Sequence, residues 1–154
     1  MMPLHQRDGW VGVSESEGEN AARAWFIRGG HSEPPESRLD VRDPGWNDEQ
    51  LTDVDHTGDR ILTTALNAGR ITVRSFPALD VLRHIDAEDE ELHQGACFVG
   101  SHVLARLYRR QATVAIDAEG RLEELEVDNG WLVPGADDSW LSVTANSVRR
   151  WILV

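Results

Sequence analysis

The chain has 154 residues, with 15 Lys or Arg against 27 Asp or Glu, so its formal net charge at pH 7 is -12. A surface this acidic repels nucleic-acid phosphates and anionic lipid, which argues against nucleic acid and membranes as partners. Apolar residues make up 40% of the chain, and no stretch approaches the roughly 18 apolar residues of a spanning helix. We therefore expect one soluble domain over 1–154, which is cytoplasmic because no signal segment is visible.

The first third of the chain is polar and contains two short apolar runs of strand type, 10–13 and 22–27. Gly, Pro, Ser and charged residues then fill 29–47, a composition that favours a flexible loop without regular structure. A loop of this length in a compact domain is either functional or disordered, and the sequence leaves that choice open.

Three segments in the middle of the chain are predicted to form helices. In 57–68 the apolar residues recur at helical spacing, Thr57 can cap the start and Gly69 can end the helix. The segment 78–85 follows a proline that suits a first helical turn. The segment 97–108 fits a helix, although its apolar residues also suit one face of a strand.

Most of the remaining segments alternate between apolar and polar residues, as half-buried strands do. One such run is 70–76, and the clearest hairpin joins 112–116 to 122–127, where Gly120 can supply a positive φ. Three further strands are expected at 130–133, 139–144 and 148–154. The predicted fold class is therefore α+β, with an antiparallel β-meander or barrel-like sheet in the C-terminal half and two or three short helices.

The densest group of reactive side chains is His84, His93, Cys97 and His102. On a helix His93 and Cys97 share a face, but His102 lies roughly 140° away, so the three do not converge on zinc. No metal and no cofactor is predicted. A cysteine that starts a helix after a glycine would have a lowered pKa, which favours a nucleophilic thiolate.

The run Gly95-Ala96-Cys97-Phe98, followed by Ser101-His102, resembles the cysteine-bearing helix of protein glutaminases and other papain-like enzymes. The resemblance implies a nucleophilic Cys97, and the candidate catalytic residues are Cys97, His102 and His93. Those enzymes take their general base from a later strand, and no histidine follows His102 in this chain, so a base would have to come from His31, His56 or His84 upstream. The alternative is that Cys97 is a small buried apolar residue.

The segment 53–59 places oxygen-bearing side chains at alternate positions with Gly58 sixth, which is how a calcium loop begins. The twelfth position is Thr64 in place of a bidentate glutamate. Capping of a following helix is therefore the favoured interpretation.

Six tryptophans are a heavy aromatic load for this length. In a curved sheet such rings often line a cavity for an apolar ligand, and core packing is the alternative. The candidate ligand-binding residues are Trp25, Trp131, Trp140 and Trp151.

Three functions remain open. The first is a small β-rich protein that binds an apolar organic ligand in a Trp-lined pocket, or an accessory catalyst of small-molecule metabolism. The second is an acidic inhibitor or immunity-type module that binds a basic protein through 86–91 or through Glu123, Glu124 and Glu126. The third is a cysteine-dependent hydrolase or deamidase-like enzyme centred on Cys97. The sequence also leaves a homodimer open.

Overall fold

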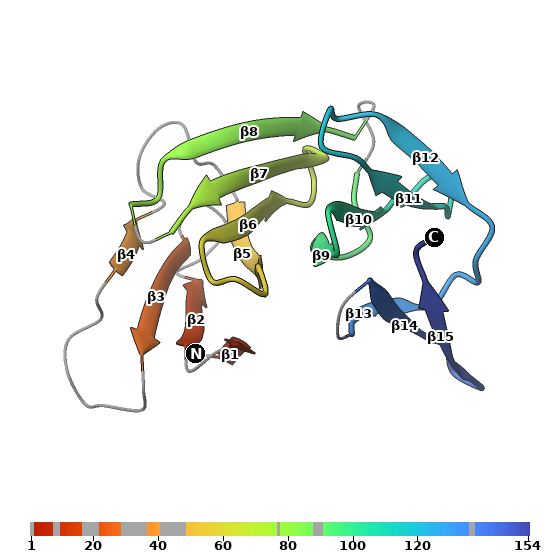
Figure 1. The fold of residues 1–154 in the computed structure, drawn as a ribbon, viewed down its shortest axis with the longest axis horizontal. Helices are drawn as coiled ribbons and strands as arrows, with labels where there is room; N and C mark the ends of the chain where they lie inside the picture. Colours follow the sequence, from red (N-terminus) through yellow and green to blue (C-terminus); the bar gives the residue numbers. More distant parts are fainter. Residues whose placement is uncertain are drawn as a thin grey trace.

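The computed structural model describes residues 49–76, 78–87, 91–135 and 138–154 with side chains, Gln50 excepted, and the strands within residues 2–40 as backbone. Every regular element in these residues is a β-strand, and the strands form four antiparallel sheets in chain order (Figure 1). The α+β prediction is therefore wrong for the part of the chain that is described. That part also contains no helix long and apolar enough to cross a membrane.

Each sheet is an antiparallel meander of consecutive strands. The first contains β1 (Met2–Arg7), β2 (Trp10–Ser16), β3 (Ala22–Arg28) and β4 (Ser37–Asp40). The second contains β5 (Glu49–Val54), β6 (Arg60–Ala65), β7 (Arg70–Ser75) and β8 (Val81–Asp86). The third contains β9 (Cys97–Val99), β10 (His102–Arg106), β11 (Thr113–Ile116) and β12 (Leu122–Leu125). The fourth contains β13 (Trp131–Pro134), β14 (Ser139–Val143) and β15 (Val148–Ile152).

The four sheets follow one another around an arc, and we call each sheet a blade. The first strand of each blade lies nearest the common centre and the last lies at the rim (Figure 1). The inner strands contact one another, since β5 contacts β1 and β9 contacts both β5 and β13. The second and third blades, which have a neighbour on each side, are therefore covered on both faces.

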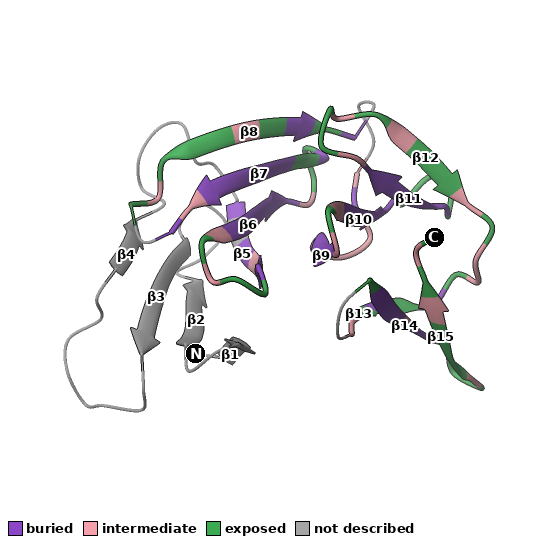
Figure 2. Ribbon diagram, in the orientation of Figure 1, coloured by how far each residue is buried: buried purple, intermediate pink, exposed green. Residues whose placement is uncertain are grey.

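Two apolar clusters fill the spaces beside the third blade. Alternate residues of β10 divide between them: Val103 and Ala105 belong to the cluster shared with the second blade, and Leu104 belongs to the cluster shared with the fourth. The strands β9, β10 and β11 are consequently buried along almost their whole length, whereas the rim strands are mostly exposed (Figure 2). This burial on both faces removes the alternation of apolar and polar residues that marks a half-buried strand.

The predicted helix at 57–68 is instead a turn followed by strand β6 and a second turn. Five consecutive residues of β6 are buried, and three of them are β-branched, which favours a strand. The side chain of Asp55 accepts hydrogen bonds from the backbone N and the hydroxyl of Thr57. These capping residues therefore close a tight turn, where Gly58 has a φ of 78°, and no helix begins.

The other two predicted helices are also wrong. The segment 78–85 lies mostly in β8, a rim strand on which Leu82 is exposed and not turned inward. The segment 97–108 contains β9 and β10, which are joined by a tight turn where Gly100 has a φ of 55°. The positive φ favours glycine there, and a β-carbon would also lie 1.9 Å from Oδ1 of Asp138, whose exposed side chain would have to move.

The strand predictions agree with the structure. The run 70–76 is β7, and the hairpin around Gly120 is β11 paired with β12. The three expected C-terminal strands are β13, β14 and β15. The two early runs lie in β2 and β3, and β4 falls within the expected loop at 29–47, most of which lies outside the described residues.

Candidate functional site

The connections between strands lie alternately at the two ends of each antiparallel blade. One end carries the connections from blade to blade and the turn after each second strand, and we call it the crossover face. In the third blade and its neighbours, the crossover face contains 87–96, 107–112 and 126–130. The opposite face contains the turns 55–59, 100–101 and 117–120.

Three aromatic rings meet on the crossover face. The ring centroid of His93 lies 5.6 Å from that of Tyr108 and 5.8 Å from that of Trp131, with interplanar angles of 70° and 64°. These edge-to-face geometries are the favoured ones for aromatic pairs. Tyr108 is 50% exposed and Trp131 is 56% exposed. We call these three residues the aromatic cluster.

The backbone beneath the aromatic cluster is held by hydrogen bonds that cross between segments. His93 N donates to the carbonyl of Arg106, and Tyr108 N donates to the carbonyl of Glu91, each at 2.8 Å. The amide side chain of Gln94 donates to the carbonyl of Leu132 at 2.9 Å and accepts from its N at 2.8 Å. The three rings are thus fixed relative to one another although they come from three separate segments.

Arg106 joins the same segments from inside the blade. Its side chain is buried, Nη1 donates to the carbonyl of Gly130 at 3.0 Å, and Nη2 donates to Oε1 of Gln111 at 3.2 Å. Burial lowers the pKa of the guanidinium, and the nearby carboxylate of Asp128 acts in the opposite direction. Gly130 is required because a β-carbon there would lie 2.6 Å from the backbone N of Val143.

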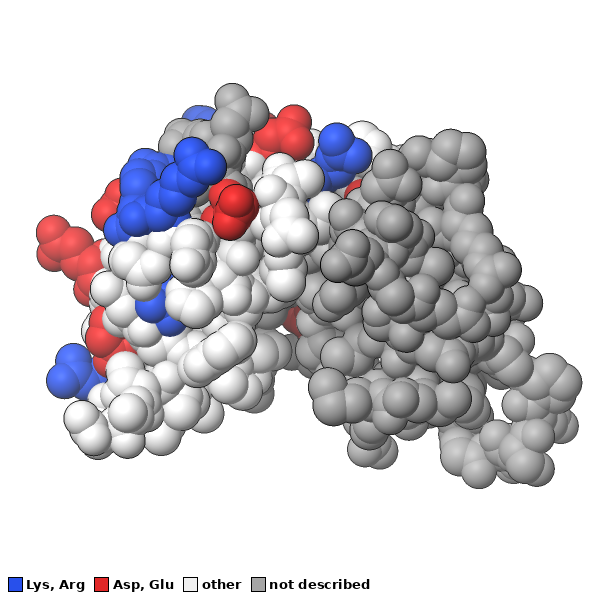
Figure 3. All heavy atoms as spheres, turned by 180° about the vertical axis from the view of Figure 1, so that it is seen from behind, with Lys and Arg blue, Asp and Glu red and all other residues white. Residues whose placement is uncertain are grey.

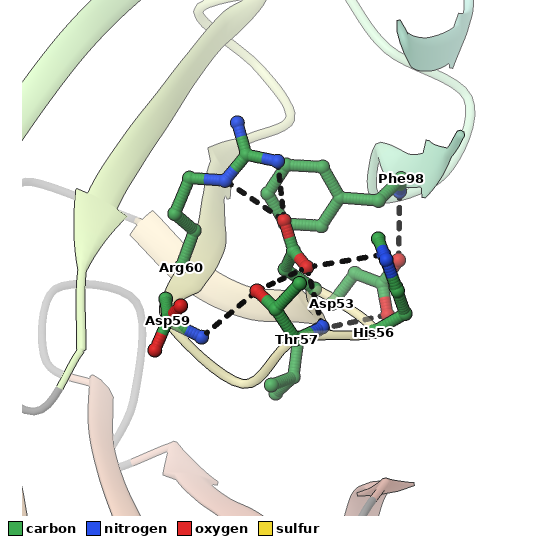
Figure 4. A network of polar contacts seen from close by, with 8 residues as sticks. Asp53, His56, Thr57, Asp59, Arg60 and Phe98 are labelled. Carbon is green, nitrogen blue, oxygen red and sulfur yellow. Dashed lines mark hydrogen bonds and ion pairs between the residues drawn. The ribbon is translucent and has the colours of Figure 1, made fainter. Parts of the chain in front are cut away.

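On the opposite face, a network of carboxylates connects the second and third blades (Figure 4). Asp53 is 1% exposed, and its Oδ2 accepts a hydrogen bond from the backbone N of Phe98 at 2.7 Å. The guanidinium of Arg60 donates through Nε and Nη2 to Oδ2 of Asp55 and lies 5.3 Å above the ring of Phe98.

Asp55 is buried, and burial alone would raise the pKa of its carboxyl group. The hydrogen bonds from Thr57 and the hydrogen bonds and charge of Arg60 outweigh that effect and hold the pKa below its usual value. These carboxylates have protein donors in place of a metal ion, and the described residues contain no cluster of three or more His, Cys, Asp and Glu side chains that could hold one.

The predicted catalytic residues lie on strands and in a loop. Cys97 is on β9, is 3% exposed and pairs with Leu104. It does not begin a helix, so the helix-dipole argument for its reactivity and the structural basis of the papain-like resemblance are wrong. His102 pairs with Val99, and its Nδ1 lies 3.2 Å from the hydroxyl of Ser101. His93 belongs to the aromatic cluster.

The predicted ligand-binding tryptophans lie in different environments. Trp140 and Trp151 stack with centroids 6.4 Å apart and an interplanar angle of 19°, and Trp140 is 2% exposed. Trp131 contacts His93. Trp25 lies on β3, and its side chain is outside the described residues.

Tyr108, Gln94 and Arg106 are not predicted by the sequence as parts of a site. Tyr108 follows the buried Leu107 and ends the segment 97–108, for which the sequence predicts a helix that does not form. No local sequence pattern marks Gln94, because its role depends on Leu132, which lies 38 residues away in the sequence.

The acidic residues named as a docking patch are partly described. Glu123, Glu124 and Glu126 are exposed along and just after β12, and Asp86 is exposed at the end of β8. Residues 88–90 lie outside the described part of the chain. On the face shown in Figure 3, charged side chains gather toward the rim of the described blades, and the surface nearer the centre is mostly uncharged.

No family model and no curated protein matches the sequence. The fold does match solved structures. The crystal structure of the RRP9 WD40 repeats gives a TM-score of 0.66 at 10% identity, over 94% of this chain and 44% of that one. The structure of U3-55K gives 0.66 at 9% identity, over 95% and 46%. A catalytically inactive virginiamycin B lyase from Staphylococcus aureus with quinupristin gives 0.59 at 9% identity, over 97% and 54%.

These similarities show the fold and nothing more, because the identities are so low. The four meander blades around a common centre are blades of the β-propeller type. The chain spans about half the length of the solved chains that it matches.

Proposed function

We propose that the chain is a protein-binding module that holds a basic segment of a partner protein on its crossover face, at the aromatic cluster. The observation that supports this proposal most is the exposure of Tyr108 and Trp131 within three touching rings on a fixed backbone. Tyr and Trp dominate binding energy at protein interfaces, because they supply a large rigid contact area at small conformational cost. The likeness to the WD40 repeats of RRP9 is consistent with a protein partner.

The charge of the chain favours a basic partner. A net charge of -12 attracts a basic segment from a distance and speeds its association. Near the cluster, Glu91 begins the segment that carries His93, and Glu126 lies on the segment that leads to Trp131. An Arg or Lys of the partner can then lie against an exposed ring, an arrangement worth roughly 0.5–1 kcal/mol at an exposed site.

Two arginines next to the aromatic cluster restrict the charge pattern that a partner segment can have. Arg109 and Arg110 follow Tyr108 and are exposed, and Nη1 of Arg110 lies 3.9 Å from a carboxylate oxygen of Glu124. A partner segment with several adjacent positive charges would be repelled at that side of the cluster. We therefore propose a segment in which single Arg or Lys residues alternate with apolar ones.

The test is selection of peptides from a random library on the purified chain, followed by affinity measurements with one selected peptide. We expect the selected peptides to contain Arg or Lys, and the W131A and Y108A variants to bind at least about 10-fold more weakly. Ile152→Ala is the matched control, because it also truncates an exposed apolar side chain but lies at the end of β15 opposite the crossover face. Selected peptides without basic residues, or equal binding by W131A and wild type, would exclude the proposal.

The other two functions remain predictions. An apolar ligand held by Trp25, Trp131, Trp140 and Trp151 lacks support from the described rings, because Trp140 and Trp151 contact each other and Trp131 contacts His93. Hydrolysis by Cys97 would require a buried thiol to become accessible.

A further inference from the structure

A pocket of about 190 Å³ lies on the opposite face, between the second and third blades. The pocket and the aromatic cluster lie at opposite ends of the strands. The residues that line the pocket come from the strand ends next to the turns 55–59, 100–101 and 117–120. Its apolar lining comes from Val73, Leu82, Phe98 and Val103, and its two cationic residues are Arg60 and Arg83. An apolar pocket with a few fixed polar groups is the usual form of a small-molecule site.

The guanidinium of Arg83 is held in place by the neighbouring blade. Nη1 donates to the carbonyl of Asp117 at 3.0 Å and also to the carbonyl of Ala118. No carboxylate among the described residues forms an ion pair with Arg83, and none of them accepts a hydrogen bond from its Nε or Nη2. A fixed guanidinium with two remaining donor nitrogens, Nε and Nη2, suits a planar carboxylate.

Arg60 plays a different part. Its Nε and Nη2 donate to Asp55, so the charge of this arginine is largely balanced, and its guanidinium covers the ring of Phe98. Arg60 therefore shapes the pocket wall. The pocket is left with about one unbalanced positive charge, which suits a single carboxylate better than a multiply charged phosphate.

We propose that this pocket binds a small monocarboxylic acid whose body is an apolar ring or branched chain. The carboxylate accepts hydrogen bonds from Arg83, and the apolar body lies against Phe98, Val73 and Val103. The pocket is smaller than the roughly 300 Å³ at which sites for drug-sized ligands begin, so the ligand has about ten non-hydrogen atoms. This site is independent of the proposed protein-binding surface.

The test uses benzoate as the probe, with benzyl alcohol as a neutral compound of nearly the same shape and inorganic phosphate as an anion without an apolar body. Binding is followed by NMR through the backbone amide signals of Phe98 and Ser101. We expect benzoate to bind with a Kd on the order of 1 mM, as suits so small a ligand. Benzyl alcohol is expected to bind at least about 10-fold more weakly, because it forms no charge-assisted hydrogen bond, and phosphate is not expected to displace benzoate.

Two variants locate the contact. Arg83→Gln should weaken benzoate binding at least about 10-fold, since it removes the charged donor. Arg149→Gln is the matched control: it makes the same change at an exposed arginine on β15, where Arg149 pairs with Asp128, and it should leave the Kd unchanged. Equal affinities for benzoate and benzyl alcohol, an unchanged Kd in R83Q, displacement by phosphate, or no shift at about 20 mM benzoate would each overturn the proposal.

Discussion

The side chain of Gln94 binds the backbone of Leu132 in both directions, through hydrogen bonds of 2.9 Å and 2.8 Å. Leu132 is 5% exposed and belongs to the apolar cluster between the third and fourth blades. At this position the amide of Gln94 satisfies the same two backbone groups of β13 that a paired strand would satisfy. The side chain of Gln94 therefore fixes the position of β13, the first strand of the fourth blade, and with it the position of Trp131.

Replacement of Gln94 by Ala is expected to lower the free energy of unfolding by about 2 kcal/mol, because both backbone groups of a buried residue lose their partners. Gln94→Glu keeps an acceptor for Leu132 N but loses the donor, so its cost should be at least as large. Urea unfolding measures both. An unchanged midpoint in Q94A would show that water satisfies Leu132 equally well.

The stacked pair Trp140 and Trp151 should be energetically coupled. Nε1 of Trp151 donates to the hydroxyl of Ser142 at 2.7 Å, whereas Nε1 of Trp140 has no hydrogen-bond acceptor among the described residues. A double-mutant cycle with W140L and W151L should give a coupling free energy of about 0.5–1.5 kcal/mol. Additive losses would mean that the two rings only fill space. Ser142→Ala should destabilise the wild type more than it destabilises W151L.

Part of the fold was readable from the sequence because its strands have one exposed face or a clear turn between them. The hairpin of β11 and β12 was found through Gly120, whose φ of 85° is one that glycine adopts readily. The C-terminal strands were found through Pro and Asn at their ends. In these cases the signal is local, so a single sequence contains it.

The helices at 57–68 and 97–108 were wrongly predicted because their strands β6, β9 and β10 are buried on both faces. In β6 the buried Thr63 donates its hydroxyl hydrogen to Glu49. The polarity of Thr63 therefore does not indicate exposure, and the apolar residues around it recur at helical spacing by coincidence. The helix at 78–85 was wrong for another reason, since β8 is a mostly exposed rim strand. The aromatic cluster was missed for a related reason, since its three rings meet only after the blades have packed.

The stability of the joint between the second and third blades should depend on pH. The pKa of Asp55 is lower in the folded chain than in the unfolded chain, where it is near the ordinary 3.8. Its contribution is therefore complete well above that value and is lost as the pH falls through the lower folded value. At pH 7 Asp55→Asn should cost about 2–3 kcal/mol, because charge-assisted hydrogen bonds from Arg60 and Thr57 are weakened.

The same difference between wild type and D55N should shrink as the pH falls below about 4. Thermal unfolding at pH 7 and pH 3 measures it. Asp59→Asn is the control, because Asp59 is exposed in the same turn and should change stability by less than about 0.5 kcal/mol. A D55N deficit that stays the same at both pH values would mean that the charge of Asp55 does not matter.

The reactivity of the Cys97 thiol distinguishes a structural role of this residue from a catalytic one. Because it is 3% exposed and packs beside Leu104 and Trp140, a thiol reagent should reach it only when the blades open. Its alkylation at pH 7 should therefore be slower than that of a free thiol by a factor of about 100 or more and should speed up with denaturant at sub-unfolding concentrations. Cys97→Ala should leave peptide binding at the aromatic cluster intact. Rapid alkylation of the folded chain would instead support the thiol enzyme over a purely structural role for Cys97.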